Sequence, residues 1–144
     1  MCPAVLENAT DIRKNWSETV DRVVREKPVF AKRTRDTIMI SDTHLISYLL
    51  TPYFFTAQEI YEDDGTLTLS LNELDLIANG PTKQEAISNL ANDILEYSIE
   101  FYDEFDYWSS ASNRQKHIPY ILKAIILGNT KAIGDVIICQ NGQN

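Results

Sequence analysis

The residues best suited to chemistry in this sequence are three consecutive acids, Glu62, Asp63 and Asp64, and two histidines, His44 and His117. Neighbouring carboxylates can transfer protons, and carboxylate and imidazole groups both bind metal ions. The acids are followed by a glycine, however, and an Asp-Gly pair between two apolar runs predicts a β-hairpin turn with solvated acids. The histidines lack the spacing of a HExxH, CxxC or His-x-His site. We therefore expect no enzyme activity, no metal site and no cofactor.

Cationic side chains gather in two places within the first fifty residues. Arg13 and Lys14 are expected in the first turn of a helix, where cations cost about 0.3–1 kcal/mol unless an anion such as phosphate binds beside them. Lys32, Arg33 and Arg35 are expected at the end of a hairpin, with both arginines on one face by strand alternation. These five residues are our candidates for an anion-binding surface. The alternative is that the hairpin cations only protect a sheet edge from aggregation.

Acidic side chains gather on a long helix expected from residue 82 onward. Its outer face carries Glu85, Asp93, Glu96, Glu100 and Asp103, roughly opposite the apolar stripe. Exposed acids beside aromatic side chains are typical of a contact surface for a cationic protein or for a second copy of the chain. The candidates for this partner-binding surface are Glu96, Glu100, Tyr102, Asp103, Tyr107 and Trp108. The alternative is that any surface helix needs a polar outer face.

Composition and charge limit the class of protein. The chain has 144 residues, is 44% hydrophobic and has a formal net charge of −8 at pH 7. Residues 1–50 hold eight Lys or Arg against seven Asp or Glu, a net charge of +1, whereas residues 51–144 hold five against fourteen, a net charge of −9. The sequence contains no signal-peptide pattern and no apolar run near 18 residues, so we expect a cytoplasmic protein without a membrane span. Its two cysteines predict no disulfide framework.

The first fifty residues predict a small strand-helix-hairpin-helix unit. A short strand over 3–8 precedes a helix that Thr10 caps and that runs to Lys27-Pro28. Its expected buried stripe is Ile12, Trp16, Val20, Val23 and Val24. Two β-prone runs, 29–34 and 37–41, then form a hairpin, and a helix over 42–50 closes the unit. A domain of this size buries only about 60% of the surface that its unfolded chain exposes, so we expect a dimer that shares its core.

The residues after Pro52 predict a different unit. Runs over 54–61, 66–71 and 74–80 are expected to form strands, and Thr82 begins a capping box that opens the long helix. Beyond it we expect a loop over 109–117, a helix from Pro119 to Gly128 and a last strand over 135–139.

Residues 3–50 resemble the DNA-binding, dimerising domain of the Phd/YefM family of antitoxins. The resemblance is carried by "TDIRKNWSETVDRV", "EKPVFAKR" and "TIMISDTHLISYL", in that order. It implies a homodimer that binds operator DNA in its own operon, with a cognate toxin as partner. In the family, an Arg in the first turn of the helix and a basic residue ending the second strand contact DNA. Arg13 and Arg33 occupy the matching positions here, and Lys14, Lys32 and Arg35 beside them complete our set of candidate DNA-binding residues.

Residues 53–95 resemble a second kind of antitoxin domain, the HicB-like domain. The stretch "YEDDGTLTLSLNELDLIANGPTKQEAISNLANDIL" carries this resemblance as a hairpin, a third strand and a capped helix. Phd/YefM antitoxins usually continue into an extended tail that wraps the toxin, and here a folded acidic domain takes its place. A toxin partner of the basic RNase type would complement that acidic charge.

The sequence as a whole predicts an α+β protein of two domains. Residues 1–50 are the Phd/YefM-like dimerisation and DNA-binding domain, and residues 53–144 are a HicB-like acidic domain with a three- or four-stranded antiparallel sheet covered by a long helix. The expected function is that of a type II antitoxin: a transcriptional autorepressor that neutralises a cognate toxin, as a homodimer or higher homo-oligomer. The alternative is an acidic homo-oligomeric protein-interaction module that has lost DNA binding, which the net charge of −9 beside +1 favours.

Overall fold

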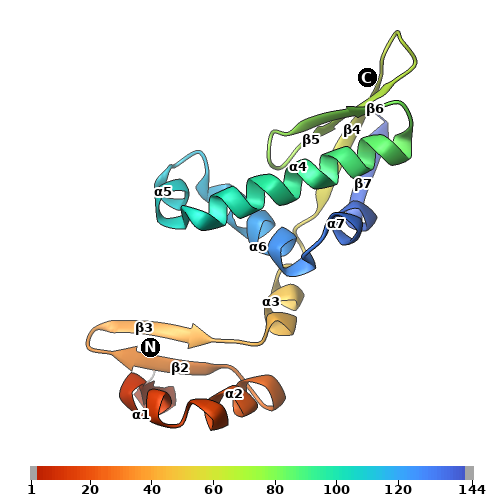
Figure 1. Cartoon of the computed structure of the whole chain (residues 1–144). Coiled ribbons are helices and arrows are strands. Elements are labelled where there is room, and N and C mark those ends of the chain that lie inside the picture. The colour runs from red at the N-terminus through yellow and green to blue at the C-terminus, as the bar shows by residue number, and fades with distance from the viewer. Residues whose placement is uncertain (1–2, 142–144) are drawn as a thin grey trace. The chain divides into compact units, whose positions relative to one another are not determined.

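The protein is described here by a computed structural model, which covers residues 3–141 (Figure 1). It is an α+β protein with a three-stranded sheet of order β1-β2-β3 and a four-stranded sheet of order β6-β5-β4-β7. The fold class predicted from the sequence is therefore confirmed. The chain divides into two compact units, one ending at Leu49 and the other beginning at Leu50.

The first unit has a three-stranded sheet, and its first two helices pack on one face of that sheet. Its elements are η1 (Pro3–Val5), β1 (Leu6–Asn8), α1 (Ala9–Lys14), α2 (Trp16–Arg25), β2 (Val29–Arg33), β3 (Asp36–Ile40) and α3 (Thr43–Leu49). Strand β1 runs parallel to β2, and β2 forms an antiparallel hairpin with β3. The predicted strand-helix-hairpin-helix order is confirmed, but the first helix is divided in two.

The division falls at Asn15, whose backbone leaves the helical region at φ −120°, ψ 40°. The Asn15 side chain donates to the carbonyl oxygen of Asp11 at 3.0 Å. Asparagine competes in this way for backbone hydrogen bonds, and so favours helix ends over helix interiors. The N-cap of α1 is Asn8, whose side chain accepts a hydrogen bond from the Thr10 amide at 2.8 Å. The predicted cap at Thr10 is wrong by two residues.

This break changes which residues of α2 are buried. Thr19 and Val23 are buried, whereas Trp16, Val20 and Val24 are 53%, 37% and 59% exposed. The predicted single stripe is therefore wrong for those three side chains, because the second helix starts in a new phase after Asn15. The small core of the unit consists of Ile12, Val23, Val29 and Ala31, with Ile40 packed against it.

The second unit is built on the four-stranded sheet. Its elements are β4 (Phe55–Tyr61), β5 (Leu67–Leu71), β6 (Ile77–Gly80), α4 (Lys83–Asp103), α5 (Phe105–Ser110), η2 (Gln115–His117), α6 (Ile118–Leu127), α7 (Thr130–Val136) and β7 (Ile137–Asn141). Figure 1 shows α4 lying along one face of this sheet, with α6 and α7 next to α4. The last strand, β7, pairs with β4 in parallel, so the sheet is mixed rather than fully antiparallel.

Local signals in this unit behave as the sequence predicts. Asp64-Gly65 makes the hairpin turn, with Gly65 at φ +87°. The Thr82 side chain caps α4 by accepting from the Glu85 amide at 3.2 Å. Gly128 ends α6 in the left-handed conformation at φ +84°. The predicted strand over 135–139 begins later, at Ile137, because Asp135 and Val136 belong to α7.

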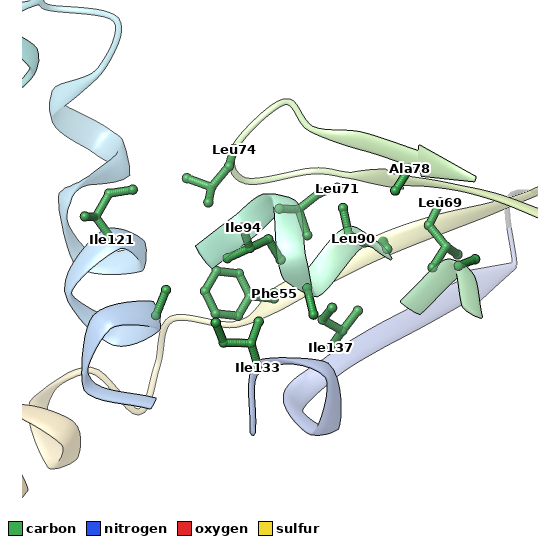
Figure 2. Packing of buried hydrophobic residues seen from close by; sticks show 14 of the residues in the cluster. Phe55, Leu69, Leu71, Leu74, Ala78, Leu90, Ile94, Ile121, Ile133 and Ile137 are labelled. Carbon is green, nitrogen blue, oxygen red and sulfur yellow. The ribbon is translucent and has the colours of Figure 1, made fainter. Parts of the chain in front are cut away.

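The core of the second unit lies between α4 and the sheet. Figure 2 shows Phe55, Ile94 and Ile133 pointing toward one another, and all three are fully buried. The start of α4 is held against β6 at Gly80, where the Cβ of any other residue would lie 2.5 Å from the backbone nitrogen of Ala86. Only glycine therefore permits this approach of helix to strand. None of the helices within residues 3–141 is long and apolar enough to cross a membrane.

Candidate DNA-binding and partner-binding surfaces

The first candidate surface is cationic and belongs to the first unit. Lys32 and Arg33 are the last two residues of β2, and the turn to β3 consists of Thr34 and Arg35. Arg35 is thus a turn residue, and the prediction that strand alternation places it on one face with Arg33 is wrong. The turn holds Thr34 at φ +55°, a conformation that a β-branched residue rarely adopts. The charge of Arg35 is carried at the tip of the hairpin.

The other two cations, Arg13 and Lys14, lie in the last turn of α1 and not in the first turn of a long helix. The C-terminal end of a helix carries partial negative charge, so these cations occupy a favourable position without any bound anion. The predicted electrostatic cost is therefore absent. Strand β1 pairs Asn8 with Lys32, and α1 follows Asn8 directly. The start of α1 thus lies beside the end of β2, which carries Lys32 and Arg33.

All five cations are exposed, and none of them forms an ion pair or a side-chain hydrogen bond within the part of the chain that the structure describes. Arg22 differs, because its Nη2 donates to Oε1 of Glu7 at 2.8 Å and fixes α2 to β1. The five candidate charges remain available to an anionic partner. A surface of this kind can bind phosphate groups through charge-assisted hydrogen bonds.

Helix α2, which follows Arg13 and Lys14 in the sequence, carries a stripe of exposed apolar side chains. Trp16, Val20 and Val24 are spaced four residues apart, which places them on one face of the helix, and all three are exposed. Thr19 and Val23 adjoin this stripe on the helix surface and are buried. Large apolar side chains exposed along one helix face mark a contact surface in a soluble protein.

The second candidate surface is acidic and lies on α4. Residues 84–113 contain seven acids and neither Lys nor Arg. Glu96, Glu100 and Asp103 are exposed, and none of them is in an ion pair among residues 3–141. Burial, with the nearby Glu96 charge, raises the pKa of the Asp93 carboxyl. This helix face therefore concentrates negative charge that other parts of the unit do not neutralise.

The three aromatic candidates differ in burial. Tyr102 and Tyr107 are 60% and 67% exposed, beside the acids of α4 and on α5. Trp108 is only partly exposed and packs against the core, stacked at 6.5 Å from the ring of Phe101. The guanidinium of Arg114 lies 5.5 Å from the Trp108 ring. Tyr102 and Tyr107 are thus open to a partner, and Trp108 lies at the edge of the core.

The acids and histidines that could have done chemistry are not assembled into one site. Asp64 accepts hydrogen bonds from the amide and hydroxyl of Thr66 at 2.9 and 2.6 Å, which stabilise the turn and lower the pKa of Asp64. His44 is exposed in the first unit and His117 is buried in the second. No group of three or more potential metal ligands occurs in residues 3–141.

One buried charged residue, Glu59, was not predicted from the sequence. Glu59 follows Phe55 and Ala57 on the inner face of β4 and is only 7% exposed. Its carboxylate accepts from Lys83 Nζ at 3.0 Å and from the Tyr61 hydroxyl at 2.8 Å, and these bonds lower the Glu59 pKa. The alternation of β4 could have placed Glu59 on the buried face. The pair joins the first turn of α4 to β4 and has a structural role.

Comparison with known proteins reveals similarity across both units. A family model named PHD-like and described as an antitoxin of RelE/RelB toxin-antitoxin systems matches residues 5–139. A crystal structure from Syntrophomonas wolfei subsp. wolfei, described as an antitoxin part of a toxin/antitoxin system, is 35% identical to this chain and superposes on it with a TM-score of 0.88. The similarity covers 94% of this chain and 98% of that one. A search of curated proteins finds no match.

Proposed function

The chain belongs to the PHD-like family of antitoxins of RelE/RelB toxin-antitoxin systems, and from this premise we propose that it is a type II antitoxin that binds operator DNA and represses its own operon. The observation that carries the DNA-binding part is the set of five exposed, unpaired cations on α1 and on the β2–β3 hairpin. Cations of this kind neutralise phosphates and release counterions, which supplies much of the affinity of a protein for DNA.

The first unit is proposed to dimerise as a Phd/YefM-like domain. Its core is small, and the Trp16, Val20 and Val24 stripe would be covered by the same stripe of a second copy. Arg13 and Lys14 immediately precede Trp16, so they would lie at the edge of that contact. A two-fold dimer presents two such sets of cations to a pseudo-palindromic operator.

The second unit is proposed to bind the cognate toxin as a HicB-like domain. The toxin fitted by this surface carries a basic face, as a basic RNase-type toxin does, and meets the acids Glu96, Glu100 and Asp103 beside Tyr102 and Tyr107. Trp108 would support this surface from the edge of the core. Opposite charges would speed the encounter, and the exposed tyrosines would contribute apolar contact area. The complex is proposed to form in the cytoplasm, where operator DNA is present.

The test of autorepression is a fluorescence-anisotropy titration of the full chain with the duplex upstream of its own gene. A scrambled duplex of the same composition is the control, and both are measured at low and moderate salt. The proposal predicts tighter binding to the natural duplex that persists at moderate salt. Equal, weak binding to both duplexes would contradict it.

The second candidate function is an acidic homo-oligomeric interaction module that no longer binds DNA. The net charge of −9 over residues 51–144 favours it, because this charge opposes DNA binding wherever the acidic unit approaches the duplex. It predicts no preference for the natural duplex together with an intact toxin complex. Co-purification of the toxin encoded beside the gene, measured alongside the titration, separates the two functions.

A further inference from the structure

Within residues 50–141, the four-stranded sheet of the second unit has one face that no described helix covers. Strand alternation places nine side chains on this face, which we call the open face: Thr56, Gln58, Ile60, Thr68, Ser70, Ile77, Asn79, Ile138 and Gln140. The side chains between them in the sequence, such as Phe55, Leu69 and Ala78, point into the core beneath α4. Ile60, Ile77 and Ile138 are 43%, 66% and 45% exposed.

The open face is uncharged, although it belongs to a unit of strongly negative charge. None of its nine residues is acidic or basic, whereas residues 51–144 carry a net charge of −9. Two acids, Glu62 and Glu73, reach its margins, where they accept hydrogen bonds from Thr68 and Thr56. An uncharged centre with a charged margin is the usual pattern of a protein interface.

The polar side chains of the open face already bond to one another across the strands. Gln58 Nε2 donates to Gln140 Oε1 at 2.8 Å, and Asn79 Nδ2 donates to Thr68 Oγ1 at 2.9 Å. These polar groups would keep their hydrogen bonds if a partner covered the face and displaced water. Covering the face would therefore avoid much of the free-energy cost of burying unsatisfied polar atoms. The exposed isoleucines would gain the favourable free energy of apolar burial.

From these observations we infer that the open face is a self-association surface, which binds the open face of a second copy of this chain. Charge decides the occupant. A cationic partner would be drawn to the acids of α4 instead, whereas the open face of a second copy brings no charged side chain into the centre of the contact. Two such faces can pack as the two sheets of a sandwich, about 10 Å apart, around a two-fold axis.

This arrangement also keeps the acidic surfaces of the two copies apart. Helix α4 covers the other face of the sheet, so Glu96 and Glu100 lie on the far side of each unit from the open face. Two sheets and two helix layers would separate the acidic surfaces by roughly 30 Å, from layer spacings of about 10 Å. That distance exceeds the Debye length of about 8 Å at physiological salt, so their repulsion is screened.

The test is the mass of the full-length protein, measured by light scattering or native mass spectrometry over micromolar to millimolar concentrations. The Ile77→Asp/Ile138→Asp variant brings carboxylates together across the proposed interface. Ile99→Asp is the matched control, since Ile99 is 49% exposed on α4 away from the sheet. We expect the double variant to have half the mass of the wild type, and the control to have the wild-type mass.

The result that overturns the inference is a folded double variant with the wild-type mass at every concentration. Circular dichroism checks folding, and Ile138→Lys on the edge strand β7 is a second variant with the same expected outcome. Adding Val20→Asp separates this surface from the proposed α2 dimer. If both surfaces act, the wild type is a tetramer, each variant is a dimer, and the combined variant is a monomer. If only the open face acts, the wild type is a dimer and Val20→Asp leaves its mass unchanged.

Discussion

The hydroxyl of Tyr97 on α4 lies 2.8 Å from Nδ1 of His117, which is buried just before α6. Arg114 donates to the same hydroxyl oxygen at 2.7 Å, so the hydroxyl proton of Tyr97 is free to be donated to Nδ1. The other ring nitrogen of His117, Nε2, is buried and has no hydrogen-bond partner among residues 3–141. Burial lowers the His117 pKa first, and the nearby charge of Arg114 lowers it further, against a smaller opposing effect of Asp75.

This relationship predicts that the protein loses stability as the pH falls from about 7.5 to about 5.5. The unfolded chain binds a proton at His117 near the unperturbed pKa of about 6.5, whereas the folded chain resists it until the pH reaches the lower folded pKa. The melting temperature should therefore drop across this window in the wild type. His117→Gln should reduce the drop, and His44→Gln, at an exposed site, should retain it. An equal drop in His117→Gln would exclude His117 as the cause.

Gly80 should tolerate no side chain. A Cβ at this position would meet the backbone of Glu85 and Ala86 at 2.5–2.8 Å, and relief requires the start of α4 to move away from β6. We expect Gly80→Ala to lower the free energy of unfolding by about 2–3 kcal/mol, as overpacking does in rigid surroundings. Gly134→Ala is the control, because its Cβ would lie 3.4 Å from the flexible side chain of Ile87. Urea denaturation compares them, and a Gly80→Ala midpoint equal to that of Gly134→Ala would contradict the prediction.

The Glu59–Lys83 pair should be more sensitive to loss of the lysine than to loss of the carboxylate charge. Lys83→Met leaves a buried carboxylate with only the Tyr61 hydroxyl as side-chain donor, whereas Glu59→Gln removes the charge itself. The pKa of Glu59 is lowered first by Lys83 and then by Tyr61, so the pair stabilises the fold above the unfolded carboxyl pKa and loses this effect in acid. We expect Lys83→Met to melt at a lower temperature than Glu59→Gln at neutral pH. The double variant should melt above Lys83→Met, and the opposite order would contradict the prediction.

Features set by neighbours in the sequence could be predicted, and features set by distant partners could not. The Asp64-Gly65 turn, the Thr82 cap and the Gly128 helix end depend on a few adjacent residues, and all three are confirmed. The parallel pairing of β7 with β4 joins residues about eighty positions apart, and no local pattern encodes it. The break at Asn15 was missed because helical periodicity continues on both sides of it.

The candidate surfaces show the same limit. The exposure of the candidate cations and acids could be predicted from their residue types, because charged side chains are rarely buried. Hydrophobicity could not tell that Trp16 and Val20 are exposed while Thr19 is buried. The exposure of the isoleucines on the open face could not be predicted either. Strand alternation shows that a sheet has two faces, but it does not show which face a helix covers.

The acidic surface of α4 should control how fast the antitoxin binds its toxin. Removing two charges by Glu96→Gln/Glu100→Gln should slow association by roughly 3- to 10-fold at low salt, with a smaller effect at high salt. Glu62→Gln/Asp63→Asn removes the same charge from a hairpin on another part of the unit and is the matched control. Biolayer interferometry with the toxin encoded beside the gene measures both rates. Equal slowing by the two variants would mean that net charge, and not this surface, guides the toxin.

Removing cations of the first unit should weaken the dependence of DNA affinity on salt concentration. Each phosphate contact contributes about 0.9 to the slope of log affinity against log salt, so Arg13→Ala and Arg33→Ala should each flatten that slope by roughly 1. Arg25→Ala is the control, because Arg25 is an exposed arginine of the same unit outside the five candidates. Each variant is titrated with the natural duplex at several salt concentrations. If all three arginines flatten the slope equally, the unit attracts DNA by its overall charge, and the assignment of Arg13 and Arg33 fails.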